Sequence, residues 1–566
     1  MENKTIYQKF IGRDRDSFKN YKELMEEYSI TYKSNFNFAY DIIDELGKTK
    51  PDKLALLYLN DDLTEEIRFT FKDMMEKSNQ VANYLTAKGI KKGDRILLVL
   101  KRSYWFWVIL LAIHKIGAIA VQATHMLMKK DYIYRCNKVL IKAVFITGDD
   151  DCTERFDEAY QDCPSVKLRF TTKHKKVDGW IDFEEEVKDY GYEFARPTGK
   201  NGTKASDTMM LSFSSGTTGY PKTIMHDFTY PLGHIATGVF WHRVVDGGLH
   251  FTISDTGWLK SLWGKFYGQW LGESAVLVFD FNKFDGEKIL KVLEKYKVTT
   301  FCVPPTMYRM ILKNDVAKYD LSSLTHCCSA GEALNPEIFK QWKNATGLEI
   351  HEGFGQTETT VCISTIKGFN KPHSGSIGLP SPGYDLIVVD EKGQEVLPGE
   401  TGEICVRASR TNRPCGLTFG YFNDDESNAF TWRQELYHTG DTAYRDEQGY
   451  IIYVGRNDDV IKSSGYRIGP FEVESVLLEH PAVSEVAVTG VPDPVRGFNV
   501  KATIVLQAGF SPSDELIKEL QNYVKENTAP YKYPRVVEFV DALPKTFAGK
   551  IRRVEIREND RKKNKN

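Results

Sequence analysis

The sequence predicts an α/β protein with largely parallel sheets, followed by a small α+β unit at the C-terminal end. Short apolar runs of strand type, such as DRILLVL at 94–100 and ESAVLVFD at 273–280, alternate with segments of helical pattern. Strands that alternate with helices in this way form layered structures with parallel sheets. The chain has 566 residues. Because this is more than one hydrophobic core holds, we expect two or more domains.

The elements of the α/β part follow one another along the chain. After the strand DRILLVL, the apolar run YWFWVILLAI at 104–113 predicts a helix that is too short to cross a bilayer. We therefore expect a buried core helix and no integral membrane segment; a surface that touches a membrane is the alternative. Further on, AVFITGD at 143–149 predicts a strand and a turn. VTTFCVPPTMYRMIL at 298–312 predicts a strand, a break at two prolines and a helix.

The pattern changes towards the C-terminal end. From 380 to 454, short strands such as DLIVVD and GEICVRA are broken by turns with glycine and proline, which predicts a small β subdomain. After it, AVSEVAVTGV and VKATIVLQ predict strands, and SDELIKELQNYVKE predicts a helix. We place a domain boundary near 456–459, which gives an N-terminal domain of 1–456 and a C-terminal domain of 457–566.

The composition excludes several classes of function. The formal net charge is −2, so no overall basic field draws the chain to nucleic acid or to an anionic membrane. The nine cysteines are scattered and odd in number, which argues against a disulfide framework, and none has the spacing of a zinc site. The polar N-terminus has no secretory pattern. We expect a cytoplasmic protein with a local binding site; its oligomeric state stays open.

One loop after a short apolar strand has the composition of a phosphate site. In LSFSSGTTGYPKTIMHD, two glycines let the backbone turn its N–H groups towards an anion, four hydroxyls add donors and a lysine adds charge. The residues concerned are Ser214, Ser215, Gly216, Thr217, Thr218, Gly219 and Lys222. Tyr220 and Pro221 stand before the lysine, where a Walker A loop has glycine, so the fold need not be that of a P-loop NTPase. An exposed turn is the alternative.

Three further stretches supply groups that suit a nucleotide. HEGFGQTETT places Thr357 beside Glu358, and a carboxylate beside hydroxyls suits a magnesium ion between protein and phosphates. Asp441 precedes a predicted hairpin that Arg456 ends, and a carboxylate held there suits the hydroxyls of ribose. ALPKTFAGKIRR carries Lys550 near the chain end. Taken singly, each stretch has an alternative: a surface turn, a surface ion pair or a solvent-facing lysine.

These four stretches, in this order and at this separation, resemble the adenylate-forming superfamily of acyl-CoA synthetases, peptide-synthetase adenylation domains and luciferases. The likeness covers about residues 37–553. SDTGW at 254–258 and SSGYRIGPFEVE at 463–474 are most similar to AMP-forming acetyl- and medium-chain acyl-CoA synthetases. The resemblance implies a large N-terminal domain of two α/β subdomains plus a distorted β-barrel. It also implies a small, mobile α+β C-terminal domain.

The resemblance implies roles in the ATP site. The loop 214–222 would grip the β- and γ-phosphates. The implied catalytic residues are Lys550, Thr357 and Glu358: Lys550 would contact the acyl carboxylate and the α-phosphate, Thr357 the α-phosphate, and Glu358 a magnesium ion. The residues implied around the adenosine are Gly331, Glu332, Ala333, Gly353, Phe354, Asp441 and Arg456.

The resemblance also implies sites for the acid and for CoA. Acetate-specific relatives carry a tryptophan at the position of Gly355, so glycine implies an open pocket and a medium-chain, branched or aromatic acid. Lys260 either bonds the acid, at a polar group or at the carboxylate itself, or extends to solvent. The residues implied in the acyl pocket are Trp258, Leu259, Lys260 and Gly355. Those implied for CoA are Ser464, Gly465 and Lys525, and the implied hinge is Asp458.

The function implied is that of an AMP-forming acyl-CoA synthetase. ATP, accompanied by Mg²⁺, and a carboxylic acid would give acyl-AMP and pyrophosphate, and CoA would then give acyl-CoA and AMP. Two alternatives stay open: a stand-alone adenylation enzyme that loads the phosphopantetheine of a carrier protein, and a non-catalytic nucleotide-binding relative. The set of Glu358, Asp441 and Lys550 argues against the second.

Overall fold

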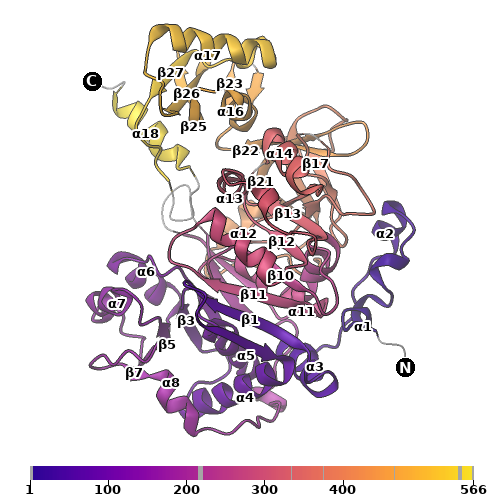
Figure 1. Cartoon of the computed structure of the whole chain (residues 1–566), viewed down its shortest axis with the longest axis vertical. Helices are drawn as coiled ribbons and strands as arrows, with labels where there is room; N and C mark the ends of the chain where they lie inside the picture. Colours follow the sequence, from indigo (N-terminus) through magenta and orange to yellow (C-terminus); the bar gives the residue numbers. More distant parts are fainter. Residues whose placement is uncertain are drawn as a thin grey trace.

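The chain folds into a large N-terminal body and a small C-terminal domain beside it (Figure 1). The body contains two large sheets and a half-barrel sheet, so the expected α/β class is confirmed. The computed structural model describes residues 4–214, 221–332, 334–373, 375–464, 466–545 and 551–563.

The first large sheet has nine strands among the described residues. Its central neighbours are parallel, and its two ends are closed by antiparallel strands. In spatial order the strands are β16 (Leu379–Pro380), β15 (Ile363–Ser364), β14 (Ile350–Phe354), β13 (His326–Ala330), β12 (Thr300–Cys302), β10 (Leu249–Thr252), β11 (Ala275–Asp280), β1 (Leu54–Asn60) and β2 (Glu66–Thr70).

The second large sheet has eight strands in the described part of the chain. Its six consecutive parallel strands end in an antiparallel pair that carries the predicted phosphate loop. In spatial order the strands are β19 (Gly420–Tyr421), β9 (Thr223–Asp227), β8 (Thr208–Phe213), β4 (Ile119–Gln122), β3 (Arg95–Val99), β5 (Ala143–Ile146), β6 (Leu168–Thr171) and β7 (Ile181–Asp182).

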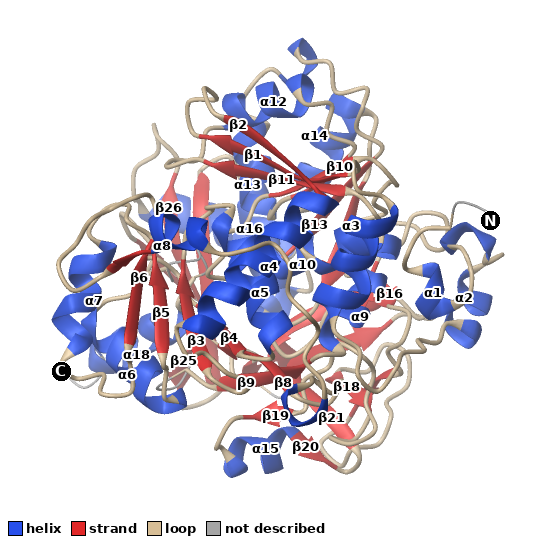
Figure 2. Ribbon diagram, turned by 90° about the horizontal axis from the view of Figure 1, so that it is seen from below, coloured by secondary structure: helices blue, strands red, loops and turns tan. Residues whose placement is uncertain are grey.

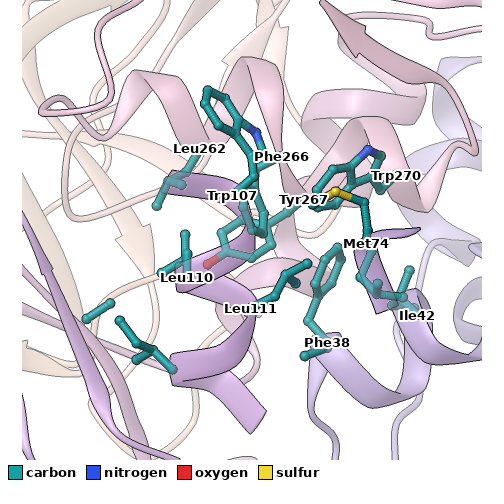
Figure 3. Close-up of a cluster of buried hydrophobic side chains, with 14 of the residues drawn as sticks. Phe38, Ile42, Met74, Trp107, Leu110, Leu111, Leu262, Phe266, Tyr267 and Trp270 are labelled. Carbon is teal, nitrogen blue, oxygen red and sulfur yellow. The ribbon is translucent and has the colours of Figure 1, made fainter. Parts of the chain in front are cut away.

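Helices fill the space between the two sheets and cover their outer faces (Figure 2). Between the sheets lie α4 (Phe71–Ala87) and α5 (Trp105–Ile116). Every residue of α5 is buried, including His114 and Lys115 in its last turn. The apolar run before them predicts this, because a helix that is apolar all round has no face for water. Figure 3 shows part of this core, where Trp107 and Leu110 of α5 meet Phe266 and Trp270.

The other helices are shorter. Those on the outer faces and in the connections are α6 (Lys129–Val139), α7 (Cys152–Tyr160), α8 (Phe183–Glu186), α9 (Tyr230–His234), α10 (Lys260–Lys265), α11 (Tyr267–Leu271), α12 (Gly286–Lys295), α13 (Pro305–Ile311), α14 (Pro336–Thr346) and α15 (Asp425–Thr431). At the N-terminal end are α1 (Gln8–Ile11), α2 (Tyr21–Glu27) and α3 (Glu45–Thr49). Short π- or 3₁₀-helices are η1 (Arg15–Ser17), η2 (Ala39–Asp44), η3 (Val187–Asp189), η4 (Gly199–Asn201), η5 (Ile235–Trp241), η6 (Val316–Lys318) and η7 (Pro530–Lys532).

The half-barrel is a separate, antiparallel sheet. Its strands are β17 (Leu386–Val389), β18 (Gly402–Arg407), β21 (Leu436–Arg445), β20 (Trp432–Arg433) and β22 (Ile451–Arg456). The expected hairpin is formed by β21 and β22, and its register places Asp441 opposite Arg456. Gly449 supplies the positive φ, +86°, that its turn requires.

The small C-terminal domain has its own sheet and its own core. Its strands are β24 (Tyr466–Ile468), β23 (Ile461–Ser463), β26 (Gly497–Leu506), β25 (Val483–Asp493) and β27 (Val536–Phe539), and its helices are α16 (Pro470–Glu479), α17 (Asp514–Asn527) and α18 (Arg553–Lys563). The half-barrel ends at Arg456 and this sheet begins at Ile461, so four residues connect them. Across the described ranges, no helix is long and apolar enough to cross a membrane.

Candidate active site

The base of the predicted phosphate loop is closed by hydrogen bonds. β8 ends at Phe213, and the Ser214 N–H donates to the Lys222 carbonyl at 3.0 Å before β9 begins. From α6, the Tyr134 hydroxyl donates to the Pro221 carbonyl at 2.8 Å. These bonds fix the point at which Lys222 leaves the loop. The other residues predicted in this loop lie outside the described residues: Ser215, Gly216, Thr217, Thr218 and Gly219.

Tyr421 connects the end of that loop to the predicted magnesium ligand. The Lys222 Nζ lies 5.1 Å from the centroid of the Tyr421 ring, and the Tyr421 hydroxyl donates to Oε1 of Glu358 at 3.1 Å. Burial raises the pKa of the Glu358 carboxyl, against the opposing charges of Arg456 and Lys222. A carboxylate in such a place gains from a nearby cation, so its hard oxygen atoms suit magnesium held beside phosphates.

The segment that carries Thr357 and Glu358 is held through its backbone. The Thr357 carbonyl lies 2.8 Å from Nε2 of His226. Because a carbonyl only accepts, this nitrogen carries the proton. Burial lowers the pKa of His226 to about 3, so the ring stays neutral. The Thr418 N–H donates to the Glu358 carbonyl at 2.7 Å. Both side chains therefore extend from a fixed segment.

Asp441 is buried, with 3% of its surface exposed. Its carboxylate accepts a hydrogen bond from the Tyr453 hydroxyl at 2.9 Å and another from the Gln356 amide. The Arg456 Nη1 lies 3.4 Å from its Oδ2. Asp441 raises the pKa of Arg456, so the guanidinium stays charged. These contacts fix the direction of the carboxylate, as bonding to two neighbouring hydroxyls requires.

Gln356 joins the Glu358 segment to the strand of Asp441. Its Nε2 donates to the Thr439 carbonyl at 2.7 Å and to Asp441, and its Oε1 accepts from the Tyr437 hydroxyl at 2.9 Å. Sequence reasoning missed Gln356, although it stands inside the motif that names Thr357 and Glu358. Tyr421 and Tyr453 carried no signal in the sequence, because only the strand pairing brings them to the site.

The residues predicted around the adenine follow β13 and lie at the end of β14. Gly331 has φ +105°, a conformation that favours glycine. At Gly353 a side chain would meet the Trp241 ring at 2.5 Å, so glycine is required there. The Phe354 ring lies 5.8 Å from the Tyr453 ring. Glu332 is partly buried beside Gly331, and Ala333 lies outside the described residues.

Glu352 is a second residue that sequence reasoning missed. It stands on β14, and its Oε1 accepts the Leu334 N–H at 2.9 Å, which fixes the loop that follows Gly331. Burial raises the pKa of this carboxyl to about 8. Its position in HEGFGQTETT was visible in the sequence, but the contact with Leu334 was not.

The residues predicted for the acyl pocket lie at the start of α10. Trp258 and Leu259 precede the helix, and Lys260 begins it. The Lys260 Nζ donates to the Ala330 carbonyl at 2.6 Å. The side chain therefore points inward, and the alternative that it extends to solvent is wrong for this structure.

The open space expected beside Gly355 is filled, which corrects the prediction. A side chain at this position would collide with the Trp263 ring and with the Thr360 carbonyl. Trp263 is buried and its Nε1 donates to the Tyr230 hydroxyl at 3.2 Å. The glycine therefore makes room for an indole that comes from α10 rather than from position 355. Sequence reasoning missed Trp263 because nothing in the chain pairs these two positions.

The residues predicted for CoA lie in the small domain. Ser464 is exposed, and its Oγ accepts from Nη1 of Arg496 at 3.1 Å. The Lys525 Nζ lies 4.2 Å from the centroid of the Tyr533 ring, and the Arg535 guanidinium lies 4.5 Å from it. Gly465 and the predicted catalytic Lys550 lie outside the described residues.

Asp458, the predicted hinge residue, lies between two residues that are bonded to different parts of the molecule. Before it, the Asn457 N–H donates to the Gly440 carbonyl of the half-barrel at 2.9 Å. After it, Asp459 bonds Arg557 of α18 in the small domain. Asp458 itself is exposed, with its Oδ1 3.8 Å from Nε of Arg456.

The structure thus brings residues predicted for ATP together in the body, and it places residues predicted for CoA in the small domain. Contacts through Tyr421 and Gln356 link Lys222, Glu358 and Asp441 in the body. The contacts of Ser464 and Lys525 described above stay within the small domain.

Comparisons with known proteins agree with this arrangement. Residues 43–422 match the family model of the AMP-binding enzyme, and residues 472–550 match that of its C-terminal domain. A mouse protein, acyl-coenzyme A synthetase ACSM3, mitochondrial, is 38% identical over 98% of this chain and 96% of its own length. The human acyl-coenzyme A synthetase ACSM5, mitochondrial, is 39% identical over 95% of this chain and 92% of its own.

Solved structures show the same fold. The anthranilate CoA ligase AuaEII, solved with anthranoyl-AMP, is 30% identical, with a TM-score of 0.85 over 94% of this chain and 99% of its own. A benzoate CoA ligase from Burkholderia xenovorans is 28% identical, with a TM-score of 0.79 over 92% of this chain and 100% of its own.

Proposed function

Since the chain belongs to the AMP-binding enzyme family and is an acyl-CoA synthetase, we propose that it activates a compact carboxylic acid through acyl-AMP and passes the acyl group to CoA. The observation that carries the site assignment is the set of contacts by which Tyr421 and Gln356 connect Lys222, Glu358 and Asp441. Such a set offers a cation for phosphates, a ligand for magnesium and an acceptor for ribose hydroxyls at neighbouring points.

In the first half-reaction, a carboxylate oxygen of the acid attacks the α-phosphorus of ATP. The new phosphorus–oxygen bond forms as the bond to the β-phosphate breaks, and pyrophosphate leaves with the electron pair. Two anions must meet, so positive groups have to lie around them. Lys222 would hold the β- and γ-phosphates and Lys550 the α-phosphate. Magnesium bound at Glu358 would neutralise phosphate charge.

Asp441 and Arg456 would hold the ribose while the α-phosphate changes. Because Asp441 is fixed by Tyr453 and Gln356, it needs no rearrangement when the nucleotide arrives. Glu352 would keep the loop after Gly331 in place beside the adenine through its bond to Leu334. These residues position the nucleotide, whereas Lys550, Thr357 and Glu358 would face the reacting phosphate.

In the second half-reaction, the sulfur of CoA attacks the acyl carbon, the bond to the phosphate oxygen breaks and AMP leaves. We propose that the small domain turns about Asp458 between the two steps. In support, Asn457 is bonded to the half-barrel and Asp459 to α18. The exposed Ser464, with Arg496 and the cations beside Tyr533, would then receive the phosphates of CoA.

The acid pocket favours a branched or aromatic acid over a long straight chain. Trp263 and Trp241 form a buried apolar cluster with Cys302, Cys328, Ala330 and Val361, and the Trp263 ring takes the space beside Gly355. Two structural neighbours are named for anthranilate and benzoate, which are flat aromatic acids. The inward Lys260 supplies a positive charge next to Ala330, where a polar substituent of the acid would meet it.

The test is pyrophosphate release from ATP with a panel of acids, each measured with CoA and with a holo carrier protein. We expect release with branched or aromatic acids and thioester formation on CoA. Thioester formed only on the carrier protein would favour the carrier-loading alternative, and no pyrophosphate with any acid would favour the non-catalytic one. The cytoplasmic location stays a prediction, since the mouse and human relatives are named as mitochondrial.

A further inference from the structure

A second cluster of reactive side chains lies in the half-barrel, beside the strand segment of Asp441. Glu403 and Cys405 stand two residues apart on β18, and His438 of β21 pairs with Cys405 in register. One ligand atom from each lies within 4.8 Å of the others. Cys405 is fully buried and His438 is 6% exposed. The Glu403 side chain is 14% exposed.

Two groups converge on one ring nitrogen of His438. The Cys405 Sγ lies 3.3 Å from Nδ1, and Oε2 of Glu403 lies 2.9 Å from the same Nδ1. A neutral ring nitrogen holds either a proton or a lone pair. With the proton it donates to Glu403, and the thiol loses its acceptor. Without the proton it accepts from the thiol, and its lone pair faces the carboxylate. A cation placed among the three, with the thiol proton released to solvent, is coordinated by lone pairs of all three groups at once.

Two of the three spacings between donor atoms are close to those of a tetrahedral metal centre. With bonds of about 2.3 Å to sulfur and about 2.0–2.1 Å to nitrogen and oxygen, zinc separates its sulfur and nitrogen ligands by about 3.5 Å and its nitrogen and oxygen ligands by about 3.3 Å. The distances in the cluster are 3.3 Å and 2.9 Å. These two pairs of atoms therefore need to move apart by only a few tenths of an ångström, and the sulfur and oxygen atoms lie within 4.8 Å of each other.

We propose that Glu403, Cys405 and His438 bind a divalent metal ion of the zinc class. Sulfur and imidazole donors exclude magnesium and calcium as the preferred ions, since these take oxygen ligands. The cluster is invisible to sequence spacing because 33 residues separate Cys405 from His438 and only the pairing of β18 with β21 joins them.

Two further contacts of Glu403 determine which of its oxygen atoms could bind the metal ion and what competes with the ion. The Gly440 N–H donates to Oε1 of Glu403 at 2.9 Å, which leaves Oε2 as the oxygen that faces the cluster. Arg433 Nη2 lies 3.3 Å from that Oε2, and its side chain is 36% exposed. A metal ion must displace this guanidinium towards solvent. Removing the charge of Arg433 should therefore strengthen binding.

The experiment is a titration of the chelator-treated full-length protein with cobalt(II), followed by zinc competition. Tetrahedral cobalt bound to a thiolate gives visible ligand-field bands and a near-ultraviolet charge-transfer band. We expect one ion per chain and loss of both bands as zinc is added. X-ray absorption of the zinc-loaded wild-type protein should show one sulfur neighbour at about 2.3 Å, a readout that needs no variant.

The variants separate this site from adventitious binding. We expect Cys405→Ser and His438→Gln to weaken cobalt binding at least 100-fold, and Arg433→Gln to tighten it several-fold. Cys327→Ser, which changes a fully buried cysteine on β13, should leave it unchanged. Binding below one ion per chain, equal binding by Cys405→Ser, or zinc without a sulfur neighbour would each overturn the proposal.

Discussion

The residues that we assign to ATP in the body and those that we assign to CoA in the small domain are held in different ways. Asp441 is 3% exposed and contacts Tyr453, Gln356 and Arg456. Ser464, in contrast, is exposed and bonds Arg496, and Lys525 lies against one aromatic ring. A pre-formed polar site stabilises developing charge without rearranging, whereas exposed cations hold a ligand more loosely.

This contrast has a consequence for single substitutions. A change among the buried, bonded residues of the body should cost the first half-reaction heavily. A change on the exposed face of the small domain should cost the second half-reaction only slightly. Lys550 is the exception to test first, because it belongs to the small domain and yet is assigned to the first step.

The largest effect is expected for Lys550→Ala. Loss of the cation at the α-phosphate should slow acyl-AMP formation by about 1,000-fold or more, while supplied acyl-AMP and CoA still give acyl-CoA. The two steps are measured separately, by pyrophosphate release and by thioester formation. The control is Lys545→Ala, which removes a lysine paired with Glu485 at 2.6 Å in the same segment. An equal slowing of both half-reactions would contradict the assignment of Lys550 to acyl-AMP formation.

Asp441→Ala should be next in size. It removes a charged acceptor from a buried network and leaves Arg456 without its partner, so we expect kcat/KM for ATP to fall about 100-fold. Thioester formation from supplied acyl-AMP should fall less. Glu447→Ala, in the exposed turn of the same hairpin, is the control. A fall of less than threefold for Asp441→Ala would show that this carboxylate does not bind the ribose.

Trp263 should set the size of the acid. Trp263→Phe shortens the ring beside Gly355, so we expect the ratio of kcat/KM for naphthoic acid over benzoic acid to rise about tenfold. The control is Trp342→Phe, a change at a fully buried tryptophan of α14. It should leave this ratio unchanged and show how much activity a general loss of packing costs. An unchanged ratio in both variants would place the acid elsewhere.

Glu352 should make stability depend on pH. Its pKa is raised from 4.5 to about 8, so the folded chain binds more protons than the unfolded chain between these values. Stability should then fall as pH rises from 5 to 8. Glu352→Gln keeps the acceptor for Leu334 and removes the charge, so it should be more stable than wild type at pH 8, by about 1–3 kcal/mol, and equal at pH 5. Urea unfolding of both proteins at pH 5 and pH 8 measures this difference. The same difference in unfolding free energy at both pH values would contradict the prediction.

The smallest effect is expected for Lys525→Ala. Lys525 is half-buried. A cation so close to the surface contributes up to about 1 kcal/mol, so KM for CoA should rise about fivefold while pyrophosphate release stays the same. Lys518→Ala, at an exposed position on the same helix α17, is the control. A 100-fold rise in KM for CoA would mean that the residues assigned to CoA are held as firmly as those assigned to ATP.

The fold could be predicted further than the site. Alternating strands and helices predicted the layered body, and the all-apolar run at 104–113 predicted a buried helix, which is α5. These features depend on local patterns of burial, and such patterns can be recognised from consecutive residues of the sequence. The positions of Thr357, Glu358 and Asp441 were predicted in the same way, because each lies in a short motif.

What the sequence could not show depends on pairing between distant segments. Tyr421 comes from β19 and meets Glu358 only because that strand joins β9. Trp263 fills the space beside Gly355 from a helix some ninety residues earlier in the chain, so reading the glycine alone predicted an open pocket. A motif reports which groups are present; it does not report which other side chain occupies the neighbouring volume.

The backbone of Gly440 is bonded on both sides: its N–H donates to Glu403, and its carbonyl accepts from the Asn457 N–H. Asn457 precedes the proposed hinge, and Asp441 follows the glycine directly. Asn457 lies on the half-barrel side of the proposed hinge, so a turn of the small domain about Asp458 would leave its bond to Gly440 in place. The carboxylate that we assign to the ribose would then keep its direction in both half-reactions. The nucleotide would accordingly be held in the same way when pyrophosphate leaves and when the thioester forms.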